Sequence, residues 1–228
     1  QIFAWTATII GGRPVFSTAF LFVAAFIFIF VIGGVTGVMF AAIPFDQQIT
    51  DSYFVVAHFH YVLFGGSVFG IFSGIYYWFP KMSGRLLSER LGKLSFWLIL
   101  IGFNLTFLVQ HSLGLEGMPR RIYEYSAGQG WEIYNLISTI GSFVLGLGVL
   151  VTVINVARSV RRGALAGPDP WKGNTLEWFT TSPPPENNFD VIPRVRSVEP
   201  MKDIRRQVER ASEGAYAGGP AAPEKVPA

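Results

Sequence analysis

Four long apolar segments without a charged side chain constrain the fold of this chain more than any other feature. They span about residues 15–43, 53–79, 94–115 and 133–156, and none of them contains Lys, Arg, Asp or Glu. About 20 consecutive apolar residues are enough for a helix to cross the hydrocarbon core of a bilayer. Short connections join the segments, so consecutive helices are expected to be antiparallel neighbours. The sequence therefore predicts an all-α protein, a polytopic bundle of transmembrane helices.

The two ends of the chain differ from these segments. Residues 1–10 are apolar and begin at Gln1 without an initiator methionine, which we interpret as the end of a truncated fifth helix in a fragment. From 163 to 228 proline, glycine and charged residues become frequent, which is typical of an extended surface tail. Residues 1–162 are therefore predicted to form the transmembrane region. The tail is expected to contain a short helix near 201–213 and to end in a disordered segment.

Basic side chains predict the orientation of the bundle, because Lys and Arg concentrate in cytoplasmic connections. The connections on one side of the predicted membrane carry Arg13, Lys81, Arg85, Arg90, Lys93, Arg158, Arg161 and Arg162. Those on the other side carry only Arg120 and Arg121, beside the acidic residues Asp46, Asp51, Glu116, Glu124 and Glu132. We therefore expect a cytoplasmic C-terminal tail. The formal net charge of +3 does not indicate a nucleic-acid partner, and we expect membrane lipid around the bundle instead.

Two histidines lie within the second apolar segment, in the run YFVVAHFHYVL of residues 53–63. Ionisable side chains inside a bilayer are costly and usually functional. An α-helix turns about 100° per residue, so side chains two positions apart leave opposite faces. His58 and His60 are therefore not expected to share one metal ion, but each can hold a different cofactor. Neutral imidazole is a standard ligand of haem iron, and the absence of cysteine excludes Cys-attached haem in this chain.

The depth of the histidine pair supports a haem interpretation. Both residues lie about 9–12 Å from the outer end of their helix, at 1.5 Å per residue. The carboxylates of a haem bound there would approach the outer surface, where Arg120 and Arg121 are the basic residues. Guanidinium groups suit carboxylate recognition. The pattern therefore predicts haem ligands at one depth and counter-charges just above them.

Simpler interpretations of these residues remain. A histidine in a span can be a hydrogen-bonded core residue, and an arginine pair can be a solvated loop or a contact for lipid phosphate. For His111, with Gln110 and Asn104 in the third span, we favour a satisfied polar cluster or part of a hydrated path over a ligand role. A transporter or channel fragment that relays protons through the histidine pair is a further alternative, but it leaves the arginine pair unexplained.

Three motifs resemble subunit I of haem-copper cytochrome c oxidase. They are DSYFVVAHFHYVL at residues 51–63, GMPRR at 117–121, and NTLEW at 174–178 before a triple proline. The resemblance covers nearly all of residues 1–190, in order, and the first two motifs together are highly specific. It implies the C-terminal part of that subunit, with the last four of its twelve helices.

The resemblance assigns a separate haem to each histidine. By match to the motif, His58 is implied to be the axial ligand of the oxygen-binding, high-spin haem, and therefore a catalytic residue. His60 is implied to be one of two axial ligands of the low-spin haem. Phe59 is implied to lie between the two haem sites. The cofactors expected on this basis are haem a and haem a3, together with a copper ion whose ligands lie upstream of this fragment.

The residues around the histidines receive roles from the same resemblance. Arg120 and Arg121 are implied to hold haem propionates, and Asp46 matches a carboxyl group near a propionate of the oxygen-binding haem. Tyr53 matches a position close to the low-spin haem.

Two positions depart from the family pattern. Members commonly have His-Asp where this chain has Thr50 and Asp51, a pair that binds a non-redox Mg or Mn ion with a carboxylate from subunit II. Asp51 remains a candidate ligand for such a hard cation, whereas Thr50 is a poor replacement for imidazole. Many members also have a proton-channel lysine where this chain has Gln1.

The function implied by the resemblance is that of a terminal respiratory oxidase. Electrons from cytochrome c would pass through the low-spin haem to a haem-copper centre that reduces dioxygen to water, coupled to proton pumping. The implied partners are oxidase subunits II and III, cytochrome c and dioxygen, and the implied location is the inner (plasma) membrane of a bacterium. The fragment alone is not expected to be active. A quinol oxidase of the same superfamily is the alternative, distinguished by its electron donor.

Overall fold

The computed structural model describes the backbone of residues 1–217 and the side chains of residues 1–210, and this part of the chain contains helices and no strand. Its elements are α1 (Ile2–Gly11), α2 (Thr18–Phe40), α3 (Ile43–Ile49), α4 (Tyr53–Leu63), the π-helix η1 (Phe64–Val68), α5 (Phe69–Ser83), α6 (Glu89–Leu115), α7 (Glu132–Arg162), the 3-10 helix η2 (Leu176–Trp178) and α8 (Pro200–Ala217).

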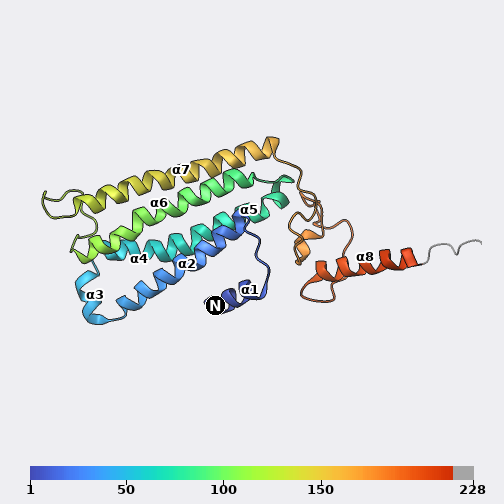
Figure 1. The fold of residues 1–228 in the computed structure, drawn as a ribbon, viewed down its shortest axis with the longest axis horizontal. Coiled ribbons are helices and arrows are strands. Elements are labelled where there is room, and N and C mark those ends of the chain that lie inside the picture. The colour runs from blue at the N-terminus through green and yellow to red at the C-terminus, as the bar shows by residue number, and fades with distance from the viewer. Residues whose placement is uncertain (218–228) are drawn as a thin grey trace, which may run out of the picture. The chain divides into compact units, whose positions relative to one another are not determined.

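Four helical stretches are long and apolar enough to cross a membrane, which confirms the predicted helical membrane fold. They are α2, the continuous stretch α4–η1–α5, α6 and α7. Figure 1 shows these helices running side by side, and direct contacts join α2 to α4, α4 to α6, and α6 to α7. The truncated helix predicted at residues 1–10 corresponds to α1, whose Trp5 ring contacts Phe26 of α2 at 5.3 Å.

Three of the four membrane-crossing stretches extend beyond the apolar segments that predicted them, whereas α2 is shorter than its segment 15–43. α6 begins at Glu89 rather than near 94, and α7 continues to Arg162 rather than ending near 156. The reason is that an apolar run ends at the first charged side chain, whereas helical hydrogen bonding continues into the polar zone outside the hydrocarbon core. Glu89 uses this extension, because its Oε2 accepts hydrogen bonds from the backbone N–H and the hydroxyl of Thr18 at the start of α2.

An aromatic cluster forms the core between the helices. The ring of Phe22 in α2 lies 5.1 Å from Phe96 and between 5.3 and 5.9 Å from Phe69, Phe72 and Tyr76. These offset and edge-to-face contacts are favourable arrangements for aromatic rings. The cluster therefore joins α2, α5 and α6 in the half of the bundle away from the two histidines.

Glycines allow α6 and α7 to approach closely. A Cβ added at Gly141 of α7 would lie 2.6 Å from the backbone nitrogen of Thr106, and one added at Gly148 would lie 2.8 Å from that of Ile99. Small residues at helix contacts are the usual means of close packing in membranes, where water does not drive association. The contact between these two helices therefore depends on the absence of side chains at these positions.

The second membrane-crossing stretch contains a π-helical turn at FGGSV, residues 64–68. A Cβ on Gly65 would overlap the side chain of Ile29, and one on Gly66 would lie 3.0 Å from the ring of Phe30. The turn therefore lies where α2 approaches the backbone closely. Single π-helical turns inside α-helices are frequent at functional sites.

Residues 80–85 and the described residues from 165 onward form a second compact unit. Lys81 is buried there and donates hydrogen bonds to the carbonyl oxygens of Pro168, Thr180 and Thr181, with its ammonium 5.1 Å from the ring centre of Trp178. In the sequence analysis Lys81 served only to predict the orientation of the bundle. In the structure it also binds three backbone carbonyls of the tail. The helix predicted near 201–213 lies within α8, and the end of the tail, residues 218–228, lies outside the described residues.

Substituting Gly141 tests the close contact between α6 and α7. We expect Gly141→Ala to destabilise the bundle by about 1–3 kcal/mol, the usual range for overpacking a dense contact. Gly146→Ala in the same helix is the matched control, because a Cβ there meets no atom within 4 Å. The measurement is loss of helical circular dichroism on denaturant titration in detergent micelles. Equal stability of the two variants would contradict the proposed packing.

Candidate functional site

The start of α4 is held against the loop that follows α6. The N–H of Tyr53 donates to the carbonyl of Met118 at 3.0 Å, and the N–H of Arg120 donates to the carbonyl of Asp51 at 2.9 Å. Ser52 caps α4, because its Oγ accepts a hydrogen bond from the N–H of Phe54. The loop that carries the predicted arginine pair is therefore fixed at the end of α4 nearest the two histidines.

His58 faces α2. Its Nδ1 lies 2.9 Å from Oγ1 of Thr36, and that hydroxyl donates its hydrogen to the carbonyl of Gly33, also at 2.9 Å. The hydroxyl proton is thereby used, so the hydroxyl oxygen accepts from Nδ1–H of the imidazole. In this arrangement the neutral ring is the tautomer with a proton on Nδ1, and its Nε2 keeps a lone pair for a ligand.

A glycine makes room for the His58 ring. A Cβ on Gly37, one position after Thr36, would lie 3.0 Å from Cε1 of His58. The ring of Phe40, one turn further along α2, lies 5.0 Å from the imidazole, centre to centre. α2 thus supplies a hydrogen-bond acceptor, a space and an aromatic neighbour to a single histidine of α4.

His60 faces α6. Its Nδ1 lies 2.7 Å from the carbonyl oxygen of Val56, which can only accept a hydrogen bond. Nδ1 is therefore the donor, and Nε2 again keeps its lone pair. The ring stacks on Phe107 of α6, with ring centres 3.9 Å apart and an interplanar angle of 14°. The ring centre of Phe59, the preceding residue, lies 4.4 Å from that of His60.

The arrangement of the two imidazoles fits haem iron better than a metal held by side chains alone. Each ring lies against a different neighbouring helix, as the spacing of two residues predicts. The described residues contain no group of three or more His, Asp or Glu placed to hold a metal ion. Haem iron already has four ligands from the porphyrin, so one neutral imidazole with a hydrogen-bonded Nδ1 is a sufficient protein contribution.

The residues predicted above the histidines occupy the end of the bundle at which α4 begins. Arg120 binds one oxygen of Asp51 through Nε at 3.2 Å and Nη2 at 2.9 Å. The Arg120 side chain is 26% exposed and that of Asp51 is 81% exposed. Arg121 adopts a positive φ of 67°, and Asp46 lies in the short helix α3. Arg120 thus binds a carboxylate in this structure. That carboxylate is the side chain of Asp51, whereas the resemblance implied a haem propionate.

The polar residues of α6 form a cluster that is only partly satisfied. The hydroxyl of Tyr61 donates to Oδ1 of Asn104 at 2.7 Å, and Nε2 of Gln110 donates to the Ser138 hydroxyl at 3.0 Å. However, Oε1 of Gln110 and Nε2 of His111 are buried without a hydrogen-bond partner among the described residues. Asn104 is therefore satisfied as expected. Gln110 and His111 each keep one buried polar atom without a hydrogen-bond partner among the described residues.

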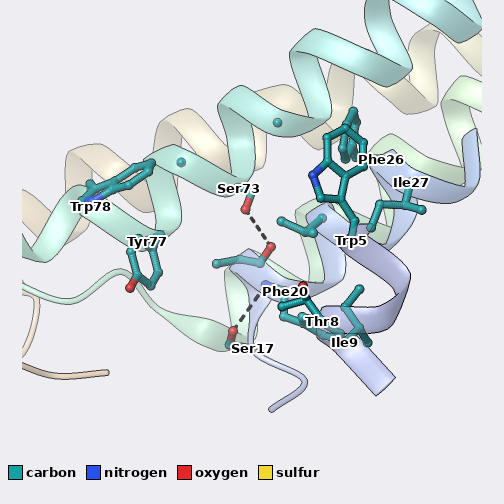
Figure 2. A pocket seen from close by; sticks show the side chains of 14 residues that line it. Trp5, Thr8, Ile9, Ser17, Phe20, Phe26, Ile27, Ser73, Tyr77 and Trp78 are labelled. Atoms are coloured by element: carbon teal, nitrogen blue, oxygen red, sulfur yellow. Dashed lines mark hydrogen bonds between the residues drawn. The ribbon is translucent and has the colours of Figure 1, made fainter. Parts of the chain in front are cut away.

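A separate apolar cavity of about 610 Å³ lies between α1, α2 and α5, and Figure 2 shows side chains that line it. Its lining includes Trp5, Phe20 and Trp78, and neither histidine of α4 contributes to it. The hydroxyls of Ser17 and Ser73 at its edge form hydrogen bonds to backbone atoms of α2. The cavity is thus an apolar space next to α1, and it shares no histidine with the candidate site.

Sequence reasoning identified the two histidines but missed Thr36, Gly37 and Phe107. These residues lie 22, 21 and 47 positions from their histidine along the chain. A threonine and a glycine side by side in an apolar helix are common, so their position alone does not indicate a ligand-supporting role. Their contribution is visible only once the helices are packed.

Comparison with known proteins supports the family resemblance. Residues 1–144 match the family described as cytochrome c and quinol oxidase polypeptide I. The chain is 53% identical over 202 residues to cytochrome c oxidase subunit 1 of Alkalihalophilus pseudofirmus, a match that covers 88% of this chain and 32% of the relative. It is 52% identical over 202 residues to cytochrome c oxidase subunit 1 of Bacillus subtilis, with the same coverage.

Two further matches extend the comparison. A probable cytochrome c oxidase subunit 1-beta of Nocardia farcinica is 50% identical over 222 residues, covering 96% of this chain and 38% of the relative. The chain therefore spans about a third of the length of these curated relatives. A heme-copper terminal oxidase dimer solved by cryo-EM has a similar fold, with a TM-score of 0.57 at 19% identity over 64% of this chain and 27% of that one.

The hydrogen bond between Thr36 and His58 predicts the tautomer of the ring. In the chain labelled with ¹⁵N-histidine, we expect Nδ1 of His58 to be protonated in the wild type and in Thr36→Ser, which keeps the hydroxyl. Thr36→Val removes the acceptor, so we expect a mixture of tautomers at His58, measured by ¹⁵N chemical shifts. His60 is the internal control, because its acceptor is the backbone carbonyl of Val56. An unchanged His58 signal in Thr36→Val would contradict the assignment.

Proposed function

Because this chain belongs to the family of cytochrome c and quinol oxidase polypeptide I, we propose that it is the C-terminal, haem-binding part of the catalytic subunit of a terminal respiratory oxidase. The complete enzyme would oxidise cytochrome c, reduce dioxygen to water and pump protons. Its partners would be oxidase subunits II and III, and its location the inner membrane of a bacterium with the C-terminal tail in the cytoplasm. Relatives named cytochrome c oxidase support the choice of donor.

The observation that carries this proposal is the geometry of the histidine pair. Two neutral imidazoles leave one helix toward two different neighbours, and each has its Nδ1 bound by an acceptor. A haem, when bound, would supply one-electron transfer and oxygen binding. We assign the oxygen-binding haem to His58 and the low-spin haem to His60. These would be haem a3 and haem a, with the copper ligands supplied by the part of the subunit outside this chain.

The protein would orient both ligands through their hydrogen-bonded Nδ1 atoms. An acceptor at Nδ1 fixes the ring plane and raises the basicity of the coordinating nitrogen. The acceptors differ, since His58 has a hydroxyl that itself donates to a carbonyl, whereas His60 has a carbonyl directly. The two irons would therefore have ligands of different electron-donating strength.

The outer residues would hold the polar edge of each haem. Arg120 and Arg121 would bind propionates, Asp46 would lie near a propionate of the oxygen-binding haem, and Tyr53 would lie close to the low-spin haem. The pairing of Arg120 with Asp51 supports this role, because it places a guanidinium where a carboxylate can be bound.

Two further residues belong to the proposed arrangement. Phe59, between His58 and His60 in sequence, would lie between the two haem sites. Asp51 would be a ligand of a Mg or Mn ion only with further ligands from other parts of the complex, because the described residues provide no metal cluster of their own.

A quinol oxidase is the second candidate, because the matched family includes both cytochrome c and quinol oxidases. The electron donor distinguishes them. Oxygen consumption by membranes that contain the complete subunit should depend on reduced cytochrome c under our proposal. Consumption driven by quinol and unaffected by cytochrome c would favour the alternative.

Replacing each histidine in the complete subunit tests the assignment of two haems. We expect His58→Ala to abolish the carbon monoxide-sensitive haem signal and oxygen reduction, because His58 would hold the haem that binds oxygen. His60→Ala should instead remove the low-spin signal. The measurement is a reduced-minus-oxidised optical spectrum of native membranes with and without carbon monoxide.

The control for this experiment changes a histidine outside the proposed pair of ligands. His111→Ala alters the third histidine of the chain, which we do not assign to an iron, and both haem signals should persist. A His58→Ala or His60→Ala protein that keeps both haems intact would overturn the opposite-face assignment. A preparation shown to contain the wild-type subunit but no haem would overturn the oxidase proposal itself.

A further inference from the structure

The three histidines of the chain differ in the group that binds their Nδ1 atom. Nδ1 of His60 lies 2.7 Å from the carbonyl oxygen of Val56, and that of His111 lies 3.2 Å from a carbonyl oxygen three residues earlier in its own helix. Nδ1 of His58 instead lies 2.9 Å from the hydroxyl of Thr36, which belongs to α2. His58 is therefore the histidine whose ring depends on a side chain of another helix.

The hydroxyl of Thr36 has a fixed direction. Thr36 is buried, with 9% of its surface exposed, and its hydroxyl donates to the carbonyl of Gly33 at 2.9 Å. A hydroxyl has one proton, so toward the imidazole this oxygen acts as the acceptor. Consecutive hydrogen bonds polarise one another, most strongly where water is absent. The bond to Gly33 therefore makes Thr36 a stronger acceptor for the Nδ1–H group than an isolated hydroxyl would be.

The packing of α2 against α4 holds this hydroxyl at the ring. A Cβ added at Gly33 would lie 3.0 Å from the backbone of Tyr61, and one added at Gly37 would lie 3.0 Å from Cε1 of His58. Threonine in a helix is restricted at χ1, and one of its preferred rotamers bonds a carbonyl three or four residues earlier. Close packing and a restricted rotamer together present the hydroxyl at one position.

We propose that Thr36 is a positioning residue that sets the electron-donating strength of His58, and through it the reduction potential of the haem that His58 would hold. The inference rests on the proposed function, because His58 is assigned there as an iron ligand. An acceptor at Nδ1 makes Nε2 a stronger electron donor. Stronger donation favours oxidised over reduced iron, and hydrogen bonding around a haem ligand is one of the means by which a protein adjusts the potential.

Replacing Thr36 in the complete subunit tests this role. Thr36→Val removes the hydroxyl and keeps the branched shape of the side chain, whereas Thr36→Ser keeps the hydroxyl. Thr36→Cys provides a sulfur, which is a weak acceptor. The first measurement is the iron–imidazole stretching frequency of the reduced, carbon monoxide-reactive haem by resonance Raman spectroscopy. The second is the midpoint potential of the same haem by spectroelectrochemical titration, and neither measurement requires turnover.

We expect Thr36→Val to lower the stretching frequency and to shift the equilibrium toward reduced iron by about tenfold, at the lower end of the effects of residues that support a metal ligand. A tenfold change corresponds to a rise of about 59 mV in the potential of a one-electron couple. Thr36→Ser should keep the wild-type values, and Thr36→Cys should lie between the two. The low-spin haem is the internal control, because its proposed ligand His60 binds a carbonyl of its own helix.

Thr152→Val is the matched control for the loss of a buried hydroxyl. Thr152 lies in the membrane-crossing helix α7, is 5% exposed, and donates its hydroxyl proton to the carbonyl of Gly148 at 3.3 Å. It therefore resembles Thr36 in burial and in its bond to a glycine carbonyl, but its recorded hydrogen bond involves no histidine. Both readouts should keep their wild-type values in Thr152→Val.

Three results would overturn the inference. Unchanged frequency and potential in Thr36→Val would show that another acceptor, such as the carbonyl of Gly33, is sufficient, and the oxidase assignment would stand. An equal shift in Thr152→Val or at the low-spin haem would show a general effect of packing. A wild-type subunit without a carbon monoxide-reactive haem would overturn the proposed function, and the role of Thr36 with it.

Discussion

The close approach of α4 to its two neighbours is the constraint on which the rest of the site depends. A Cβ on Gly33 or Gly37 of α2 would lie 3.0 Å from α4, and one on Gly114 of α6 would overlap the backbone of Phe54. Helices can approach this closely only where a side chain is absent. These glycines bring α4 near enough for Thr36 to bind His58 and for Phe107 to cover His60. The chemistry of the two imidazoles is thus a consequence of helix packing.

The same contacts explain why the two histidines are not equivalent. Both are half-buried members of one helix, two residues apart. One binds a hydroxyl that belongs to another helix, whereas the other binds a carbonyl of its own helix, four residues earlier. The second bond forms wherever the helix forms. The first depends on the register between α2 and α4, so the environment of His58 is the more sensitive of the two to packing.

Charged residues at the helix ends have structural roles beyond marking orientation. Glu89 receives two hydrogen bonds from Thr18 at the start of α2, and Lys81 donates to three carbonyls of the tail. Arg120 pairs with Asp51 across the loops at the other end of the bundle. Lys81 is buried, and its three acceptors stabilise a charge that would be costly without partners.

The sequence by itself determined the four membrane-crossing helices, because a bilayer of fixed thickness demands a minimum apolar length. It also determined that His58 and His60 leave opposite faces, because helical rotation per residue is a local property. Only the tertiary structure decided which groups meet those rings, since Thr36 and Phe107 are remote in sequence and lie on other helices. It also decided that Arg120 contacts Asp51 and that α6 begins at Glu89. Periodicity and length are encoded within a segment, whereas the register between segments depends on how all the helices pack together.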